Sequence, residues 1–520
     1  MRTPLRVKGS PRQRVNRSQS YPAPVAGWNA RDSLAAMKPN HAIVLSNWFP
    51  RTSYCEIRGG YASHATGTTG AVKTLATFNG ANGTSKMFAA TPSGVYDVSS
   101  AGAVGASVAA RTDGKHQTTN FADGTNQYLM MFNGVDVPLY YDGTNWIEVT
   151  GVSSPALTGL TTTEIFAAFV FKGRLMFLQK SSLSFWYLAS GVAGGALTEF
   201  DLGGVAKKGG YLVAAATWTI DAGDGADDKA VFVTSEGEVL VYQGTNPSSA
   251  TAWALVGVYD LGEPLGRRCL TRFGGDLVII TQNGAFPLSA ALQTATIDNR
   301  LAITNIIEDA FADAARSYGS TFGWEATLYP AQGALIVNVP ITEGGTHEQY
   351  VMNTITKSWC KFTSWDAETF VVFNGELYFA TSTTVQKAWT GTIDGVNNIV
   401  AYGKTAFSYF GDMGSQKRYN MFRPVLAVNG NLSFLTDIDV DFNDTEIAGT
   451  ANYSVISGAS WDVGNWDVAY WAAGMEVIKE WTSPDEDMGY CASGKVKIET
   501  NNLVVQWLAN DYIFEVGNSL

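Results

Sequence analysis

The sequence is poor in charge, cysteine and histidine. Charged residues make up 16% of the 520 residues, and there are only four cysteines and four histidines. The cysteines are far apart and form no Cys-x-x-Cys pair, so we expect reduced, mostly buried thiols and no disulfide framework. The histidines form no zinc-binding group, and no glycine-rich phosphate-binding loop is present. We therefore predict no metal site and no cofactor.

Long apolar runs are also missing. About the longest is IFAAFVF at residues 165–171, well short of the roughly 18 residues that suggest a membrane-spanning helix. The first residues carry charge but lack the apolar core of a signal peptide. The sequence thus predicts a protein without a membrane span that folds in a cytoplasm.

Acidic residues exceed basic ones, and the formal net charge is −12. Residues 1–20 reverse this balance with six basic residues and no acidic one, which predicts a basic flexible arm over 1–20. The remainder is therefore more acidic than the total. An acidic body argues against sequence-specific nucleic-acid binding, which needs a basic surface.

Glycine and aromatic residues are plentiful instead. The chain has 54 glycines and 12% aromatic residues, a composition that favours many short strands and tight turns over long helices. Apolar runs meet across glycine-bearing turns along the whole first part of the chain. These turns centre on Gly94, Gly134, Gly173, Gly237, Gly284, Gly333 and Gly375.

The turns recur about every 40 to 50 residues, which is the sequence signature of a β-propeller blade. We predict an all-β chain with a β-propeller of six or seven blades over residues 71–400. An N-terminal segment over residues 21–70 leads into it. Aromatic residues that follow the turns are expected to wedge between neighbouring sheets. They include Trp146, Trp253, Trp359 and Trp389.

Apolar and polar residues alternate less regularly from about residue 400 onward, and residues 401–520 are predicted to form a small C-terminal β-sandwich-like domain. One amphipathic helix is expected at residues 305–319. In the C-terminal part, Asp437, Asp439 and Asp441 alternate and so should project from one strand face. We interpret them as a candidate acidic face along a DNA passage.

A ladder of tryptophan and aspartate residues, WDVGNWDVAYW, lies at 461–471. Trp461, Trp466 and Trp471 recur at five-residue steps, which no helix or strand places on one side. A soluble protein rarely leaves three tryptophans in water. We predict that they form an assembly interface with an adjacent subunit or tail protein.

Several motifs resemble those of propeller-type tail hub or nozzle proteins of short-tailed bacteriophages (podoviruses). Leu45 to Trp48 and then Arg58 to Gly60 match a Leu-x-Asn-Trp step that leads into a strand ending in Arg-Gly-Gly. Residues 353–381 resemble the final blade of that family. Residues 417–424 and the Trp-Asp ladder resemble its C-terminal domain, whereas the basic arm has no counterpart.

The resemblance implies a structural protein of the virion tail, assembled in the host cytoplasm and not an enzyme. Such proteins form a homo-oligomeric ring, usually of six copies, below the portal and adaptor proteins. The ring seals packaged DNA and then conducts the double strand during ejection without sequence-specific binding. The alternatives are a carbohydrate-binding or carbohydrate-cleaving propeller of the tail, because DGTNW at 142–146 resembles a sialidase turn, and a host-derived propeller scaffold.

Overall fold

The computed structural model describes residues 16–80, 83–219, 228–293, 298–447, 449, 475–478, 480–484, 488–500 and 502–517. The chain divides into two compact units. One unit is continuous and spans Arg58–Asn397; the other combines Met1–Ile57 with Asn398–Leu520. The predicted N-terminal segment therefore does not stand alone, since residues up to Ile57 join the C-terminal residues. Of the predicted arm, residues 16–20 belong to strand β1 (Asn16–Pro22), and residues 1–15 lie outside the described residues.

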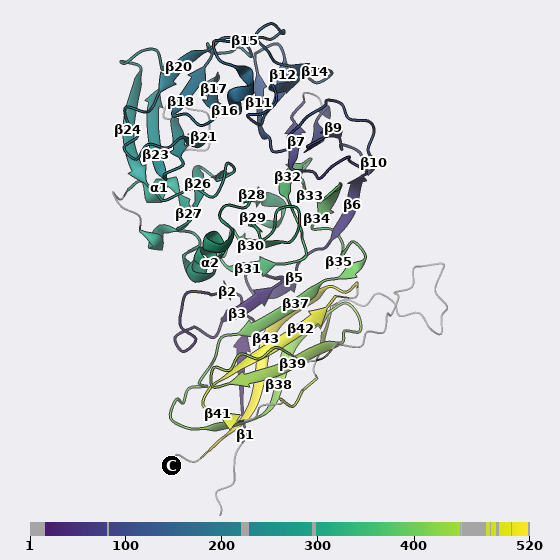
Figure 1. Ribbon diagram of the computed structural model, residues 1–520. Helices are drawn as coiled ribbons and strands as arrows, with labels where there is room; N and C mark the ends of the chain where they lie inside the picture. The colour runs from purple at the N-terminus through teal and green to yellow at the C-terminus, as the bar shows by residue number, and fades with distance from the viewer. Residues whose placement is uncertain are drawn as a thin grey trace, which may run out of the picture. The chain divides into compact units, whose positions relative to one another are not determined.

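The continuous unit is a β-propeller of antiparallel sheets (Figure 1). Five sheets of three or four strands are complete in themselves. They are β7–β9 (Thr74–Phe78, Lys86–Thr91, Gly94–Asp97), β11–β14 (Gln117–Ala122, Gln127–Phe132, Leu139–Tyr141, Trp146–Glu148), β16–β18 with β20 (Ile165–Phe171, Arg174–Gln179, Ser184–Tyr187, Thr198–Asp201), β21–β24 (Leu212–Trp218, Lys229–Thr234, Glu238–Gly244, Trp253–Asp260) and β25–β27 (Leu270–Phe273, Asp276–Thr281, Gly284–Pro287).

Two further antiparallel groups continue the series. They are β28–β31 (Glu325–Tyr329, Ala334–Pro340, His347–Asn353, Trp359–Phe362) and β32–β34 (Thr369–Phe373, Glu376–Thr381, Thr384–Ala388) with β6 (Tyr61–Thr66). Strand β6 pairs antiparallel with β34, so the first and last parts of the unit share one sheet. We call the strand that begins each sheet or group its first strand. These first strands lie side by side in the order β7, β11, β16, β21, β25, β28 and β32, and β32 lies beside β7 again. The predictions of an all-β chain and a propeller are confirmed.

Few helices interrupt the strands. The predicted helix is confirmed as α2 (Glu308–Tyr318), which buries Phe311, Ala314 and Ala315. The remaining short elements are α1 (Leu288–Ala291), the 3-10 turns η2 (Thr162–Glu164), η3 (Asn299–Leu301), η4 (Asn305–Ile307) and η5 (Pro330–Gln332), and the two-residue strands β10 (Gly102–Ala103), β15 (Leu157–Thr158), β19 (Gly195–Ala196), β35 (Ile393–Asp394) and β36 (Asn397–Asn398). Among the described residues, no helix is long and apolar enough to cross a membrane.

Burial explains why the middle strands of the propeller are continuous apolar runs. All seven residues of β29 are buried, because neighbouring sheets cover both faces of the strand. The predicted aromatic wedges lie between sheets: Trp146 meets Phe88 of the preceding sheet at 4.8 Å between ring centroids, and Trp253 meets Phe171 at 5.6 Å. The seven turn glycines all have positive φ angles. They occupy different hairpins within their sheets, which is why their spacing is uneven.

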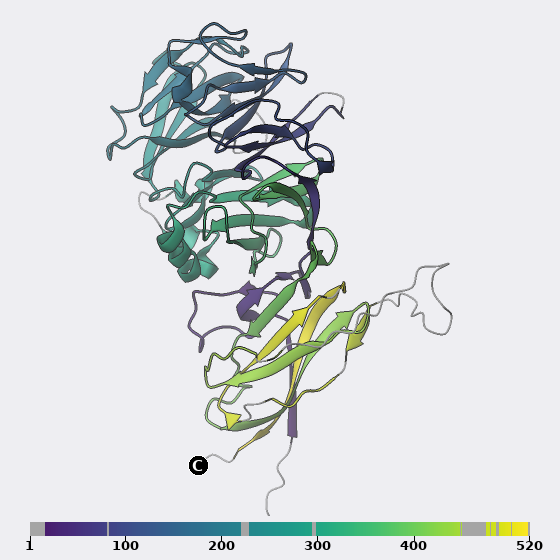
Figure 2. The same ribbon diagram turned by 45° about the vertical axis from the view of Figure 1, so that its right-hand side comes forward.

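The second unit is a sandwich of two sheets (Figure 1 and Figure 2). One sheet contains β1, β4 (Trp48–Pro50), β5 (Cys55–Ile57), β43 (Val505–Val516), β38 (Lys417–Val428), β40 (Glu476–Ile478) and β41 (Met488–Gly489). The strands that this unit contributes to the other sheet are β2 (Gly27–Trp28), β3 (His41–Ser46), β37 (Val400–Thr405), β42 (Ala492–Glu499) and β39 (Phe434–Val440).

Glycines allow the two layers of the sandwich to approach. A Cβ on Gly403 would lie 2.5 Å from the Trp507 ring, and one on Gly494 would lie 2.5 Å from the Phe422 ring. The aromatic side chains of one sheet therefore pack directly on the backbone of the other. All four cysteines are free and buried, as predicted.

Candidate functional site

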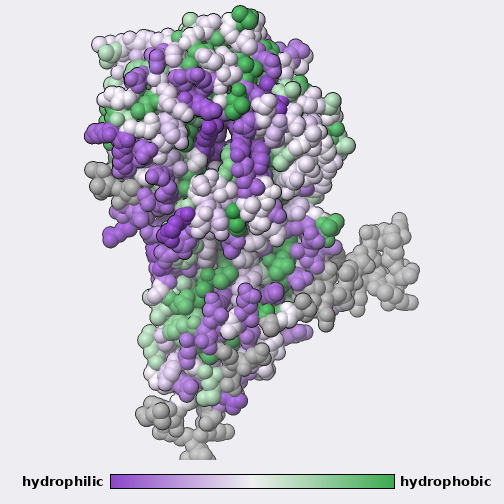
Figure 3. All heavy atoms as spheres, viewed as in Figure 1, coloured by the Kyte–Doolittle hydropathy of each residue, from purple (hydrophilic) through white to green (hydrophobic). Residues whose placement is uncertain are grey.

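Five first strands of the propeller line a pocket of about 510 Å³. Figure 3 shows a hollow in the propeller unit bordered by hydrophilic residues. Strands β11, β16, β21, β25 and β28 supply the walls, and much of the lining is alanine and threonine, including Ala167, Ala168 and Ala214 to Thr217. Small side chains fit here because the first strands converge on the propeller centre. We call this cavity the axial pocket.

Side-chain hydrogen bonds connect neighbouring first strands. The hydroxyl of Thr119 on β11 donates to the Ala168 carbonyl on β16 at 2.5 Å. The hydroxyl of Thr217 on β21 donates to the Val170 carbonyl, which is also on β16, at 2.6 Å. These first strands share no backbone ladder, so the hydroxyls satisfy carbonyls that would otherwise lack a partner at the pocket wall.

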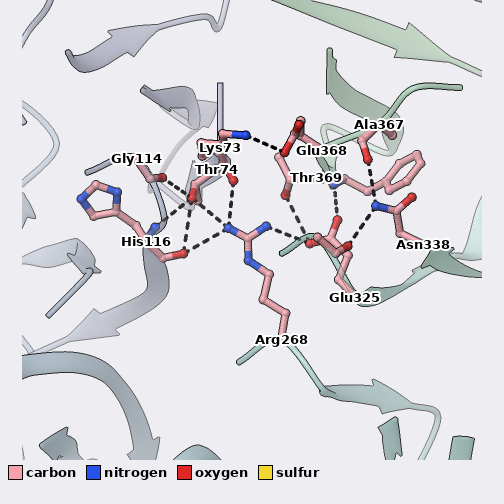
Figure 4. A network of polar contacts seen from close by, with 12 residues as sticks. Lys73, Thr74, Gly114, His116, Arg268, Glu325, Asn338, Ala367, Glu368 and Thr369 are labelled. Atoms are coloured by element: carbon pink, nitrogen blue, oxygen red, sulfur yellow. Dashed lines mark hydrogen bonds and ion pairs between the residues drawn. The ribbon is translucent and has the colours of Figure 1, made fainter. Parts of the chain in front are cut away.

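Arg268 dominates the part of the pocket near the amino ends of the first strands (Figure 4). One guanidinium nitrogen lies 3.1 Å from Glu325, at the start of β28. The other donates to the Lys73 carbonyl (3.0 Å), the Thr74 hydroxyl (2.8 Å) and the His116 carbonyl (3.3 Å). A single side chain thereby connects residues at the starts of β7, β11 and β28.

Glu325 is held equally firmly. It accepts hydrogen bonds from the Thr369 hydroxyl at 3.3 Å and from the Phe370 amide at the start of β32. Burial raises the pKa of Glu325, although Arg268 and these hydrogen bonds oppose the rise. A carboxyl with a raised pKa in a pocket is a candidate proton donor. Among the described residues that line the axial pocket, however, Glu325 is the only carboxylic acid.

Further charged residues extend this polar network. The Lys73 ammonium lies 3.1 Å from Glu368 and 3.4 Å from Glu343, and Lys115 lies 2.7 Å from Glu343. Burial lowers the pKa of His116 to about 4, so its imidazole is neutral near pH 7 and too weak a base for that pH. Within the described part of the chain, no group of three or more His, Cys, Asp or Glu residues could hold a metal ion.

The predicted acidic face is not an open row of carboxylates. Asp439 is fully buried and lies 2.7 Å from both Lys404 and Lys495, and Asp437 lies 3.0 Å from Lys495. Asp441 follows the end of β39 and accepts a hydrogen bond from the Tyr490 amide. Two lysines on neighbouring strands therefore neutralise the aspartates of β39, and the assignment of Asp437, Asp439 and Asp441 to a DNA passage stays a prediction.

The three ladder tryptophans, Trp461, Trp466 and Trp471, lie outside the described residues, so their role in assembly stays a prediction. Sequence reasoning missed Arg268 and Glu325 entirely. The one available signal was the pair Arg267–Arg268 directly before a buried cysteine in an acidic chain. Nothing local indicated that a glutamate 57 positions later would face it.

No protein-family profile matches the sequence, and no curated protein matches it. Among solved structures, the chain is similar to the β-propeller domain of Cps50 (Swd1) from Myceliophteria thermophila, with 10% identity, a TM-score of 0.39 and coverage of 63% of this chain and 99% of that one. It is also similar to Sqt1 of Saccharomyces cerevisiae, with 10% identity, a TM-score of 0.39 and coverage of 67% and 96%. Likenesses this distant say nothing about activity.

Proposed function

We propose that the chain is a structural subunit and not an enzyme. The observation that carries this proposal is the use made of Arg268 and Glu325: their polar atoms bind the protein's own backbone and side chains at the starts of several first strands. A hydrolase of the glycosidase type would need a second carboxylate beside the first. The described lining of the axial pocket offers none. The network suits a rigid scaffold.

We infer that the propeller has seven blades. Five sheets are self-contained, and the groups β28–β31 and β32–β34 with β6 supply the other two. The order of neighbouring first strands, which returns from β32 to β7, supports this count. Each of the seven predicted turn glycines then belongs to a different blade. The pairing of β6 with β34 would hold the ring closed.

We further infer that the subunit is a hub or nozzle protein in the tail of a short-tailed bacteriophage. The sequence steps that carry the resemblance coincide with structural junctions. Trp48 is buried against Trp507 in the sandwich, at 5.4 Å between ring centroids, and the Asn47 side chain donates to the Val400 carbonyl at 2.8 Å. Arg58 begins the propeller unit and is buried there. The motifs thus have defined roles in folding, which supports a shared architecture.

In this proposal the chain assembles in the host cytoplasm as a homo-oligomeric ring, with six copies as the expected number, beneath the portal and adaptor proteins. The ring seals and then conducts packaged double-stranded DNA. A net charge of −12 suits passage without adhesion, because an acidic protein surface repels phosphate.

Imaging of virions labelled with an antibody against this chain tests the assignment. We expect label at the tail, and rings in electron micrographs of the purified chain or of tails released from particles. Label on the capsid shell, or particles that lack the chain altogether, would contradict the tail assignment. A ring that forms in solution but is absent from virions would contradict it as well.

A carbohydrate-binding propeller of the tail is the second candidate. Two turns with the same sequence, Asp-Gly-Thr-Asn at 123–126 and 142–145, contribute residues to an open, mostly polar pocket of about 520 Å³. An open pocket lined by polar groups suits a sugar better than it suits an apolar ligand. A glycan array probed with the intact chain tests this candidate, and the absence of binding to any bacterial surface glycan would remove it.

A further inference from the structure

Positive charge exceeds negative charge in the axial pocket. Its lining includes three arginines, Arg267, Arg268 and Arg272, and one glutamate. Because Glu325 is paired with Arg268, the described lining holds no further carboxylate for Arg267 or Arg272. Asp113, outside this lining, interacts electrostatically with Arg267. This local excess stands out in a chain whose net charge is −12. A concave site with low-dielectric walls concentrates such a field.

The two remaining arginines keep most of their hydrogen-bond donors available. Arg267 lies over the Phe166 ring, 4.9 Å from the centroid, and donates to the Asn133 carbonyl at 3.4 Å. Stacking on an aromatic face positions a guanidinium without using its N–H groups. Arg272 lies on β25 and is exposed, and its side chain has no polar partner among the described residues. A guanidinium carries five N–H donors.

The size of the pocket points to a small ligand. A volume of about 510 Å³ lies within the range of roughly 300–1,000 Å³ that is typical of small-molecule sites. The alanine-rich walls leave this space open, and the network around Arg268 occupies the region at the amino ends of the first strands. Planar guanidinium groups bind phosphate and carboxylate through paired hydrogen bonds.

We propose that the axial pocket binds a small molecule bearing a phosphate or carboxylate group, held by Arg267 and Arg272. Arg268 and Glu325 act as positioning residues that keep the pocket wall rigid. This site is independent of the proposed role in a tail, because a scaffold can carry a bound anion inside each copy.

Isothermal titration of the full chain with inorganic phosphate, and separately with citrate, tests this site at constant ionic strength. We expect at least one of the two anions to bind, and the stronger one identifies the recognised group. The double variant Arg267→Ala/Arg272→Ala should bind it at least about tenfold more weakly, because two charge-assisted contacts are lost. Arg316→Ala is the matched control, since this arginine is 75% exposed on α2 and pairs only with Asp313 among the described residues.

Thermal unfolding of each variant without ligand establishes that it is folded. If the double variant does not fold, the single change Arg272→Ala at an exposed position serves instead, with the same expected direction. The proposal is overturned if neither anion binds the unmodified chain at millimolar concentration. It is also overturned if the folded arginine variants bind as tightly as the unmodified chain does.

Discussion

Arg58 and Asp394, which are 336 positions apart, form a bidentate ion pair inside the propeller unit, with nitrogen–oxygen distances of 2.8 and 2.7 Å. Their side chains are 0% and 3% exposed. The guanidinium also donates to the Thr363 carbonyl and lies 4.9 Å from the centroid of the Trp365 ring. The pair thus joins the beginning of the unit to its end.

We predict that Arg58→Ala destabilises the propeller by about 3–5 kcal/mol, because it leaves the buried Asp394 carboxylate without its partner. The stability of Arg58→Lys should lie between those of the unmodified chain and Arg58→Ala, since an ammonium keeps the charge but cannot reproduce the paired hydrogen bonds. Denaturant titration measures the free energy of unfolding. Arg316→Ala, which removes an exposed arginine, is the control and should leave it unchanged. An equal loss in both alanine variants would refute the idea.

Gly60, in the same Arg-Gly-Gly step, is expected to tolerate no side chain. A Cβ at this position would lie 1.8 Å from the Ile393 carbonyl oxygen, which belongs to the backbone and cannot move aside easily. Gly60→Ala should therefore cost about 1–3 kcal/mol or more. Gly105→Ala is the control in the same unit, because a Cβ there meets no atom within 4 Å. Similar melting temperatures for the two variants would contradict this prediction.

The Arg268–Glu325 pair should show strong coupling. Arg268→Met alone leaves a buried carboxylate unpaired, and we expect a loss of about 3–5 kcal/mol. Adding Glu325→Gln should recover part of that loss, because the buried charge disappears while an amide oxygen can still accept from the Phe370 amide. A double-mutant cycle of denaturant titrations measures the coupling energy. Simple additivity of the two changes would count against the pair.

Asp439 should make the stability of the sandwich depend on pH in the acidic range. Burial raises its pKa, but hydrogen bonds from Lys404, Lys495 and Thr445 outweigh burial and lower the pKa below its usual value. The stabilisation is therefore fully present above the unfolded-state pKa of about 3.9 and is lost as the pH falls through the lower folded-state pKa. The free energy of unfolding as a function of pH measures this loss.

Asp439→Asn should remove that acid dependence and also destabilise the sandwich at neutral pH, since Lys404 and Lys495 stay buried with less negative charge beside them. Asp444→Asn is the matched control: it shares Lys404 as a partner, but its side chain is 77% exposed. A large effect of Asp444→Asn together with a small effect of Asp439→Asn would show that the buried pair is not the source.

Local patterns predicted the elements well. Glycine turns, helix α2 and the aromatic wedge at Trp146 each depend on residues close together in the sequence. A further local signal was missed. The sequence Thr-x-x-Gly occurs at 91–94, 234–237 and 281–284, each time at the end of the second strand of a sheet. In all three, the buried threonine hydroxyl accepts a backbone N–H from a residue that follows it closely in the chain, namely Gly94, Glu238 and Asn283.

The candidate site was not predictable in the same way. Arg268 lies just before β25, and Glu325 is the first residue of β28. The two side chains meet only because these first strands converge at the centre of the propeller. The alternation of Asp437 and Asp439 correctly placed both on the face of β39 that meets Lys495. It did not reveal that lysines of β37 and β42 cover that face.

The all-β class, the recurring hairpins and the less regular alternation after residue 400 could be predicted from the sequence alone, because strand periodicity and turn chemistry act over a few residues. The pairing of β6 with β34, and that of β1 and β5 with β43, is evident only in the folded structure. Backbone N–H and C=O groups are the same in nearly every residue, so they do not specify which strands pair. A strand's distant partner therefore depends on which arrangement buries the most apolar surface across the whole chain. The axial pocket and its arginines are a consequence of that same closure.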